Sequence, residues 1–265
     1  MSTLRRLDAE LVRRGMARSR DAARELVESG SVLVKGTRAE KAARQVSTAD
    51  PIVLTNQETT GWVSRGSGKL IGALDVFSGV RISDRVCLDA GASTGGFTAV
   101  LLERGARLVY AVDVGYGQLA WRLQQDPRVD IRDRFNVRNL AADDLPEVPE
   151  LIVADLSFIS LRTVLPALRR SSALSADFVL MVKPQFEVGR GALGKNGVVR
   201  DPALRADAVR SVAQTALDLG LGCAGVAASP LPGPSGNVEF FLWLHEDAPP
   251  MVEDDLQAAI TLGPD

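Results

Sequence analysis

The sequence predicts an α/β protein in which a small α+β module precedes a larger domain with a doubly wound, Rossmann-like sheet. From about residue 69 onward, short apolar runs alternate with helical segments, which is typical of parallel strands buried on both faces. Before that point the chain is basic, and the remainder is acidic. Hydrophobic residues make up 46% of the 265 residues and charged residues 24%, a balance that excludes disordered, collagen-like and coiled-coil classes.

The charge of the chain is divided unevenly along its length. Residues 1–47 contain 11 Lys/Arg and 6 Asp/Glu, whereas the remainder contains 20 and 27, which leaves a net charge of -2 for the whole chain. A basic head on an acidic body is typical of a module that binds a polyanion. A solvated helix surface is the alternative interpretation of the same charges.

The basic head contains signals for two helices and two strands. Leucines at positions 4, 7 and 11 recur at helical spacing, and Gly15 ends this first helix. Ser19 is a good N-cap for a second helix, which ends at Ser29-Gly30. Residues 32–34 and 51–54 are expected as strands, with a tight turn at Lys35-Gly36 after the first of them.

Basic side chains lie on and between these elements, where their cationic groups suit contacts to phosphate. The candidates for RNA binding are Arg13, Arg14, Arg18, Arg20, Arg24 and Lys35. About residues 5–54 resemble the small helix-helix-strand RNA-binding module named after ribosomal protein S-four. The resemblance is carried by Leu7, Asp8, Leu11, Gly15, Ser19, Arg20, Ala23, Leu26, Gly30, Val32, Val34 and Gly36, and it departs from the usual signature at Lys35, where that signature has Asn.

A polar, glycine-containing segment separates the basic head from the rest of the chain. Residues 56–60 are polar, and residues 61–68 contain several glycines and serines around Trp62. We therefore expect an RNA-binding domain over residues 1–59, a linker over 60–68 and a second domain over 69–265.

The second domain alternates between expected helices and strands. Helices are expected over residues 73–77 and 98–104, and strands over 85–88, 108–112, 151–154, 178–182 and 238–244. Trp121 and Trp243 are expected in the core, and His245 is expected to be exposed.

The first of these strands ends in a glycine-rich turn that predicts a cofactor site at the carboxyl edge of the sheet. The candidate cofactor residues here are Asp89, Gly91, Ser93, Thr94, Gly95, Gly96 and Phe97. Asp113 ends the next strand and is well placed for ribose hydroxyls, and Asp133 is a candidate neighbour of an adenine, with surface solvation as the alternative. The spacing is not that of a dinucleotide fingerprint or a phosphate-binding loop. It favours S-adenosylmethionine, although NAD would also place an acid at Asp113.

Four further charged residues lie near strand ends, where hydride transfer would not require them. Asp155 and Lys183 each follow a strand, Glu239 lies beside the last strand, and Lys69 follows the linker. Because the carboxyl ends of parallel strands share one crevice, these side chains are expected to converge there.

This set resembles the Lys-Asp-Lys-Glu tetrad of the FtsJ-like ribose 2′-O-methyltransferases. The surrounding segments resemble the TlyA family, which joins an S-four-like module to such a domain. They are residues 62–66, 89–97, 113–119, 155–160, 183–187 and 235–239. The resemblance implies S-adenosylmethionine-dependent 2′-O-methylation of cytidine in ribosomal RNA within ribosomal subunits. The basic start before Leu7 resembles the actinobacterial subgroup, which implies both 16S and 23S RNA as substrates.

Within the tetrad, Lys183 is the candidate base that removes the proton of the ribose hydroxyl. Lys69 is the candidate neighbouring cation, and Asp155 and Glu239 would orient the two lysines. Stabilisation of the developing alkoxide is the alternative role for Lys183.

Additional RNA contacts are predicted in the second domain at Arg65, Phe158, Ser235 and Asn237. Phe158 is a candidate for stacking on a base, and a core position beside its strand is the alternative. Arg134 and Arg138 are candidates for the same RNA track, with ordinary solvation as the alternative.

Three other functions remain open from the sequence. A base N-methyltransferase would carry an Asn/Asp-Pro-Pro-aromatic motif, but the corresponding strand end opens with Lys183. A non-catalytic ribosome-assembly factor would not need the tetrad, and a membrane-active lysin would need an apolar segment longer than the five-residue runs present here. The two widely separated cysteines indicate neither a disulfide framework nor a metal site. We expect a cytoplasmic monomer without metal.

Overall fold

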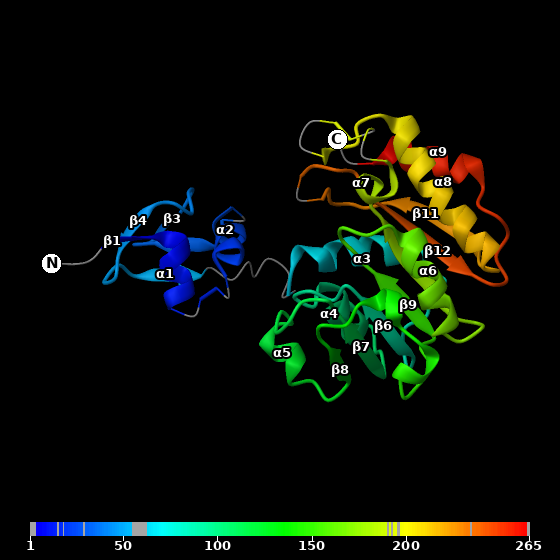
Figure 1. The fold of residues 1–265 in the computed structure, drawn as a ribbon, viewed down its shortest axis with the longest axis horizontal. Helices are drawn as coiled ribbons and strands as arrows, with labels where there is room; N and C mark the ends of the chain where they lie inside the picture. Colours follow the sequence, from blue (N-terminus) through cyan, green and yellow to red (C-terminus); the bar gives the residue numbers. More distant parts are fainter. Residues whose placement is uncertain are drawn as a thin grey trace. The chain divides into compact units, whose positions relative to one another are not determined.

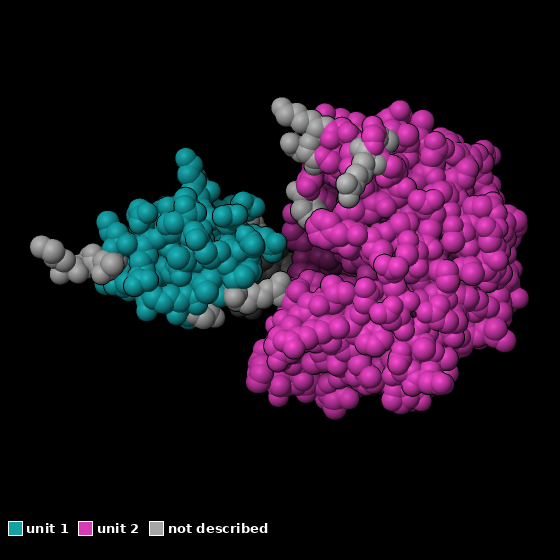
Figure 2. Space-filling model, in the orientation of Figure 1, with its two compact units in different colours: residues 1–62 teal, residues 63–265 magenta. Residues whose placement is uncertain are grey.

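The computed structural model describes residues 4–14, 16–17, 19–28, 30–54, 63–189, 191, 193–194, 197–233 and 235–263. The chain divides into two compact units, Met1–Trp62 and Val63–Asp265 (Figure 2). The predictions made for Gly15, Arg18, Ser29 and residues 55–62 lie outside the described residues. The domain bounds expected from the sequence stay a prediction.

The described residues of the N-terminal unit form two helices and five short strands (Figure 1). They are β1 (Leu4–Arg6), α1 (Leu7–Arg13), α2 (Arg20–Glu28), β2 (Val32–Val34), β3 (Thr37–Arg38), β4 (Gln45–Ser47) and β5 (Ile52–Leu54). Antiparallel pairing joins β2 to both β3 and β5, and β1 to β4. Leu7, Leu11, Ala23 and Val27 from the two helices share a core with Val32 of β2.

Local signals of the sequence explain most of this unit. The Ala22 N–H donates to Ser19 Oγ over 3.1 Å, which confirms the predicted N-cap of α2. Lys35 and Gly36 have φ angles of 55° and 77°, as a two-residue turn between β2 and β3 requires. The prediction of a helix from Leu4 was wrong, because residues 4–6 pair with β4 and the helix begins only at Leu7.

The C-terminal unit is built on a seven-stranded sheet with the order β11-β12-β10-β9-β6-β7-β8 (Figure 1). Its strands are β6 (Val86–Ala90), β7 (Leu108–Val112), β8 (Val129–Arg132), β9 (Leu151–Ala154), β10 (Asp177–Val182), β11 (Gly222–Ala228) and β12 (Phe240–His245). The pairs among β6 to β10 are parallel, whereas β12 runs antiparallel to both β10 and β11.

Helices cover both faces of this sheet, which confirms the predicted doubly wound architecture. They are α3 (Arg65–Val76), α4 (Gly96–Glu103), α5 (Trp121–Gln124), α6 (Leu161–Arg170), α7 (Pro184–Glu187), α8 (Pro202–Asp218) and α9 (Glu253–Leu262), with 3₁₀ turns at Val137–Asn139 and Ala142–Asp144. Alternate residues Val86, Leu88 and Ala90 of β6 share one core with α6, α8 and α9. Asp89 points to the other face and contacts α4 through Thr98.

Several element boundaries differ from the sequence prediction. Helix α3 begins at Arg65, so residues 65–68 are helical although they were predicted as linker. The last strand begins at Phe240, which leaves Glu239 just before it. Trp121 was predicted in the core, but its side chain is 72% exposed at the start of α5. Trp243 is partly buried and its Nε1 donates to Asp177 over 2.8 Å, and its ring contacts that of His245, which is only partly exposed.

Both cysteines are free and buried in the sheet of the C-terminal unit, Cys87 in β6 and Cys223 in β11. Among the described residues, no helix is long and apolar enough to cross a membrane.

Candidate active site

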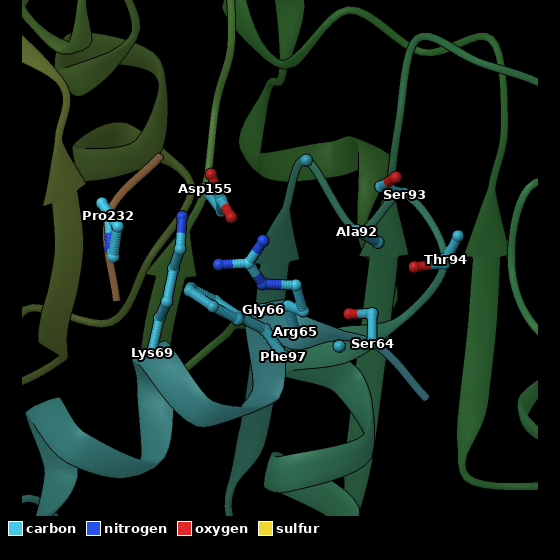
Figure 3. Close-up of a pocket in the computed structure, with 12 residues that line it drawn as sticks. Ser64, Arg65, Gly66, Lys69, Ala92, Ser93, Thr94, Phe97, Asp155 and Pro232 are labelled. Atoms are coloured by element: carbon cyan, nitrogen blue, oxygen red, sulfur yellow. The ribbon is translucent and has the colours of Figure 1, made fainter. Parts of the chain in front are cut away.

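A cavity at the carboxyl edge of the sheet brings together residues that follow β6 and β9 and residues of the first turns of α3. It is lined by Ser64, Arg65, Gly66, Lys69, Gly91, Ala92, Ser93, Thr94, Gly96, Phe97, Asp155 and Pro232. The side chains of Lys69 and Arg65 extend into it from α3, and that of Asp155 extends into it from the end of β9 (Figure 3). Most of the predicted cofactor loop therefore lies at one cavity, while Asp89, Gly95, Asp113 and Asp133 do not line it.

The loop after β6 passes close to neighbouring backbone. Gly91 has a φ angle of 87°, and a Cβ there would lie 2.6 Å from the carbonyl oxygen of Asp155. A Cβ on Gly96 would lie 2.4 Å from Ser64 Oγ. Only glycine fits these approaches, so the loop lies against both the end of β9 and the start of α3. No side chain caps the N-terminus of α4, which leaves its first N–H groups available to an anionic ligand group.

Asp113 and Asp133 organise the neighbouring loops from the ends of β7 and β8. Asp113 accepts hydrogen bonds from the N–H groups of Ser93 and Gly115 over 2.8 and 2.6 Å. Asp133 accepts one from the Gly117 N–H over 2.7 Å. Both acids lie at the sheet edge that carries the cavity, and their contacts to a ribose and an adenine stay predictions.

Asp89 is fully buried beneath the cofactor loop. Thr98 Oγ1 donates to its Oδ2 over 2.6 Å, and its Oδ1 has no partner among the described residues. Desolvation raises the pKa of this carboxyl group to about 7, and the nearby carboxylates of Asp155 and Asp113 add to that rise. Asp89 therefore supports the loop from below, and a direct cofactor contact stays a prediction.

The four tetrad residues form two ion pairs, in which both lysines and Glu239 are buried and Asp155 is partly exposed. Lys69 Nζ lies 2.5 Å from Glu239 Oε2, and Lys183 Nζ lies 2.5 Å from Asp155 Oδ1 and 2.9 Å from Ser157 Oγ. The lysines are 7% and 8% exposed, and Glu239 is fully buried. Buried ammonium groups require such partners, because an unpaired charge in the interior is costly. The pairs join the end of β9 to the end of β10, and α3 to the residue before β12.

Glu239 also shows how closely the backbone surrounds this site. Its Oε1 has no hydrogen-bond partner among the described residues. A Cβ on Gly233 would lie 2.6 Å from that oxygen, so a larger residue at position 233 would displace the carboxylate. The segment before β12 thus holds Glu239 against Lys69.

Arg65 was predicted to bind RNA, and the structure places its exposed side chain at the mouth of the cofactor cavity (Figure 3). Its helix is anchored to the loop, because Ser67 Oγ donates to the Gly96 carbonyl over 2.9 Å. Ser64 and Pro232 line the same cavity and were missed by the sequence analysis. Ser64 lies next to Arg65, which the sequence analysis named, so its neighbour could have pointed to it. No feature of the sequence pointed to Pro232.

Phe158 lies on the surface, so the alternative of a core position was wrong. Its side chain is 91% exposed and its backbone has a φ angle of 64°. The ring centroid lies 5.3 Å from that of Phe186 in α7. An exposed ring three residues after Asp155 is available to a base, and this contact stays a prediction.

The other predicted RNA contacts near the site differ in accessibility. Ser235 is exposed. Asn237 is only 2% exposed, and its amide accepts from the Val199 N–H over 2.9 Å and donates to the Gly197 carbonyl over 3.1 Å. The side chain of Asn237 therefore holds residues 197–199 in place, and its contact to RNA stays a prediction.

The described candidates for RNA binding in the N-terminal unit are each paired with a carboxylate. Arg13, Arg20, Arg24 and Lys35 form ion pairs with Glu10, Asp8, Asp21 and Asp50, respectively, and are 46%, 54%, 51% and 61% exposed. Arg14 pairs with Glu10, donates to the carbonyls of Asp50 and Thr48, and is only 21% exposed. Arg14 thus has a structural role that its sequence position did not reveal, whereas the other four remain accessible to phosphate.

Comparison with known proteins agrees with this architecture. A sequence model described as FtsJ-like methyltransferase matches residues 62–246. The chain belongs to the FtsJ-like methyltransferase family. An S4 domain model matches residues 5–52, within the N-terminal unit. The chain therefore joins an RNA-binding module to a methyltransferase domain, as the resemblance implied.

Relatives of this FtsJ-like chain cover between about two thirds and all of its length. A Mycobacterium tuberculosis protein named 16S/23S rRNA (cytidine-2′-O)-methyltransferase TlyA is 53% identical over 100% of both chains. A Campylobacter jejuni protein named 23S rRNA (cytidine-2′-O)-methyltransferase TlyA is 34% identical over 69% of this chain and 70% of its own. A solved structure from Streptococcus thermophilus with a provisional hemolysin name is 36% identical, covers 98% of this chain and 96% of its own, and has a TM-score of 0.78.

Proposed function

We propose that this chain transfers a methyl group from S-adenosylmethionine to the ribose 2′-hydroxyl of a cytidine in ribosomal RNA. The observation that carries the proposal is the pair of buried lysine–carboxylate contacts beside the glycine-rich cavity. A base methyltransferase would need carbonyl acceptors for an amine at this strand end. The end of β10 presents the ammonium group of Lys183 instead.

The charged and hydrogen-bonding groups of the cavity suit those of S-adenosylmethionine. Arg65 and the uncapped N-terminus of α4 suit the carboxylate of the methionine end, and Asp155 suits its ammonium group. Asp113, at the end of β7, suits the ribose hydroxyls. When bound, S-adenosylmethionine supplies an activated methyl group on a positively charged sulfur.

Lys183 is proposed to bind the acceptor hydroxyl. Asp155 and Ser157 hold its Nζ at the end of β10, which fixes the direction of the acceptor. As a neutral amine Lys183 accepts the hydroxyl proton, and as an ammonium group it stabilises the alkoxide. A pH–rate profile distinguishes the two roles, because only the first requires loss of a lysine proton before the reaction.

The N-terminal unit is proposed to bind the RNA around the target nucleotide. Its four half-exposed cations, Arg13, Arg20, Arg24 and Lys35, suit phosphates, and Phe158 suits a base near the site. By similarity to the mycobacterial relative, whose name gives 16S and 23S rRNA, the substrates would be both of these RNAs. We further propose that the chain meets them in ribosomal subunits in the cytoplasm and acts as a monomer.

The deciding experiment measures transfer of tritiated methyl from S-adenosylmethionine to unmodified small and large subunits. Wild type is compared with Lys183→Ala and with a matched control, Arg85→Ala. Arg85 forms an ion pair with Asp177 over 2.6 Å at the opposite edge of the sheet. The expected result is label in ribose 2′-O positions of both RNAs, reduced roughly 1,000-fold by Lys183→Ala and little changed by the control.

Other outcomes would replace the proposal. Label in a base would indicate an N-methyltransferase, and label in one RNA alone would narrow the substrate. No label in either subunit, with cofactor binding intact, would favour a ribosome-assembly factor.

A further inference from the structure

Two segments at the active-site edge contact one another residue by residue. Residues 155–160 follow β9, and residues 183–187 follow β10 and include the short helix α7. Lys183 contacts Asp155 and Ser157, the Phe186 ring lies against that of Phe158, and Glu187 contacts Ser160. The second segment therefore holds the first at its start, middle and end.

Glu187 makes the most contacts at the far end of this arrangement. It is 7% exposed, its Oε2 accepts from Ser160 Oγ over 2.5 Å, and its Oε1 accepts from the buried Leu161 N–H over 2.7 Å. Arg162 adds a contact from Nε to Oε2 at 3.3 Å and one from its guanidinium to the Glu187 carbonyl at 3.0 Å. A buried carboxylate with this set of donors fixes the start of α6 to the end of α7.

The loop that ends at this junction contains a strained residue. Phe158 is 91% exposed and has a left-handed backbone with a φ angle of 64°. An exposed phenylalanine has no burial energy to offset that conformation, so contacts at both ends of the loop must maintain it. Lys183 holds the loop through Asp155 and Ser157, and Glu187 holds it through Ser160 and Leu161.

We propose that Glu187 is a positioning residue that sets the geometry of the acceptor loop 155–160 relative to Lys183. Glu187 does not line the cavity beside the glycine-rich loop and acts through Ser160 and Leu161. Loss of its carboxylate releases one end of the loop and misplaces Ser157 and Phe158, while the cofactor loop after β6 keeps its own contacts. This inference rests on the proposed ribose methylation.

The test compares Glu187→Ala with Glu187→Gln in the full-length chain. The glutamine carbonyl still accepts from the Leu161 N–H, and its amide donates to Ser160 Oγ, so only the contact from Arg162 Nε is lost with the charge. Asp177→Ala is the matched control, because Asp177 is a partly buried carboxylate that pairs with Arg85 and Trp243 at the opposite sheet edge. Ser160→Ala is a milder second variant that removes only one of the contacts.

The measurements are kcat and KM for ribose methylation, the cofactor Kd, the Tm, and the exchange rate of the Leu161 amide. For Glu187→Ala we expect kcat to fall about 100-fold and the amide to exchange faster, with cofactor Kd and KM within about threefold of wild type. Ser160→Ala is expected to lower kcat about tenfold, and Glu187→Gln to keep all values near wild type. Asp177→Ala is expected to lower Tm while kcat is retained.

Three results would overturn the inference: an unchanged kcat in Glu187→Ala, a Glu187→Gln variant as inactive as Glu187→Ala, or an Asp177→Ala control that loses kcat equally. A wild-type chain that labels no ribose would overturn the proposed function, and with it the catalytic part of this inference. The Leu161 exchange rates would still decide whether Glu187 holds the loop.

Discussion

Carboxylates are buried in both units of the molecule, but their surroundings shift their pKa values in opposite directions. In α1, Glu10 accepts from Arg13 and Arg14, and Asp8 accepts from Arg6 and Arg20. The hydrogen bond from Arg13 is the main cause that lowers the pKa of Glu10 to about 2, and that from Arg6 lowers the pKa of Asp8. In β6, Asp89 has only Thr98, and desolvation raises its pKa to about 7.

This difference teaches that the partner, and not burial alone, decides the charge of an interior carboxylate. It also distinguishes two uses of ion pairs. The side chains of Arg6, Arg13 and Arg20 in the N-terminal unit remain about half exposed, so they can contact phosphate while still paired. Lys69 and Lys183 are almost fully enclosed, so their pairs define a fixed site. Changing the exposed pairs of the N-terminal unit should therefore alter RNA affinity. Changing the enclosed lysine pairs should alter stability and the methyl-transfer rate.

The largest effect is expected from breaking the most enclosed pair. Glu239→Ala leaves the Lys69 ammonium buried without a partner, so we expect the free energy of unfolding to fall by about 3–5 kcal/mol and methyl transfer to be lost. Urea unfolding measures the first effect. The double variant Lys69→Met/Glu239→Leu should recover most of the stability and none of the activity. An active double variant would show that the pair serves only the fold.

RNA affinity should respond to the exposed pairs. Replacing Arg13, Arg20, Arg24 and Lys35 together by Ala is expected to raise the Kd for ribosomal RNA about 100-fold at low salt. The slope of log Kd against log salt should become shallower by roughly 3, because about four phosphate contacts are lost. Arg14→Ala is the matched control, expected to lower Tm and leave the slope unchanged. Equal salt-dependence slopes for the two variants would contradict the structural role assigned to Arg14.

The raised pKa of Asp89 predicts a pH-dependent stability in the C-terminal unit. The folded pKa is about 7 and the ordinary value is 3.8, so between these values the folded chain retains a proton that the unfolded chain has released. This contribution is fully present below about pH 4 and is lost as the pH rises to about 7, by about 1.4 kcal/mol per pH unit. Asp89→Asn should flatten the curve of urea midpoint against pH. A curve of unchanged slope would show that Asp89 is ionised in the folded chain.

The N-terminal carboxylates do not obscure that measurement. The pKa values of Asp8 and Glu10 are lowered on folding, so their contribution is complete above their ordinary values and is lost only as the pH falls towards about 2.

The smallest effect is expected at the most exposed pair. Arg24 and Asp21 lie 3.4 Å apart with side chains 51% and 85% exposed. Asp21→Asn should therefore change the free energy of unfolding by less than about 0.5 kcal/mol, and added salt should abolish the difference. If thermal unfolding showed a larger loss of stability, exposure would not distinguish the weak ion pairs from the strong ones.

The parts of the fold that the sequence predicted are those with local signals. Residues 108–112 and 151–154 form strands β7 and β9 with the predicted bounds, because each is a continuous apolar run buried between two helical layers. Strand β8 was missed because Val129–Arg132 alternates with charged residues at the sheet edge. Strand β11 was missed because it consists mainly of small residues and contains a bulge between Cys223 and Gly225.

The sequence predicted the residues of the site, but it did not predict which of them form ion pairs with one another. All four tetrad residues were named, but the partner of Lys69 lies 170 positions away and is selected by the fold. The hydrogen bonds of Asn237 could not be predicted for the same reason, since its partners at Gly197 and Val199 depend on packing. Glu187 lay within a segment that the sequence analysis quoted, yet nothing local indicated its contacts to Ser160 and Leu161.

The reactivity of the two buried cysteines can be used to follow unfolding of the chain. Burial raises the pKa of Cys87 to about 12 and that of Cys223 to about 11, so neither thiol forms an appreciable thiolate at neutral pH. The folded protein should therefore resist alkylating reagents and work without added reductant. Cys87 lies in the interior strand β6, which is paired on both sides, and becomes reactive only when the sheet opens there, whereas Cys223 lies in the edge strand β11. Labelling at Cys223 before Cys87 would mark the edge at which the sheet first separates.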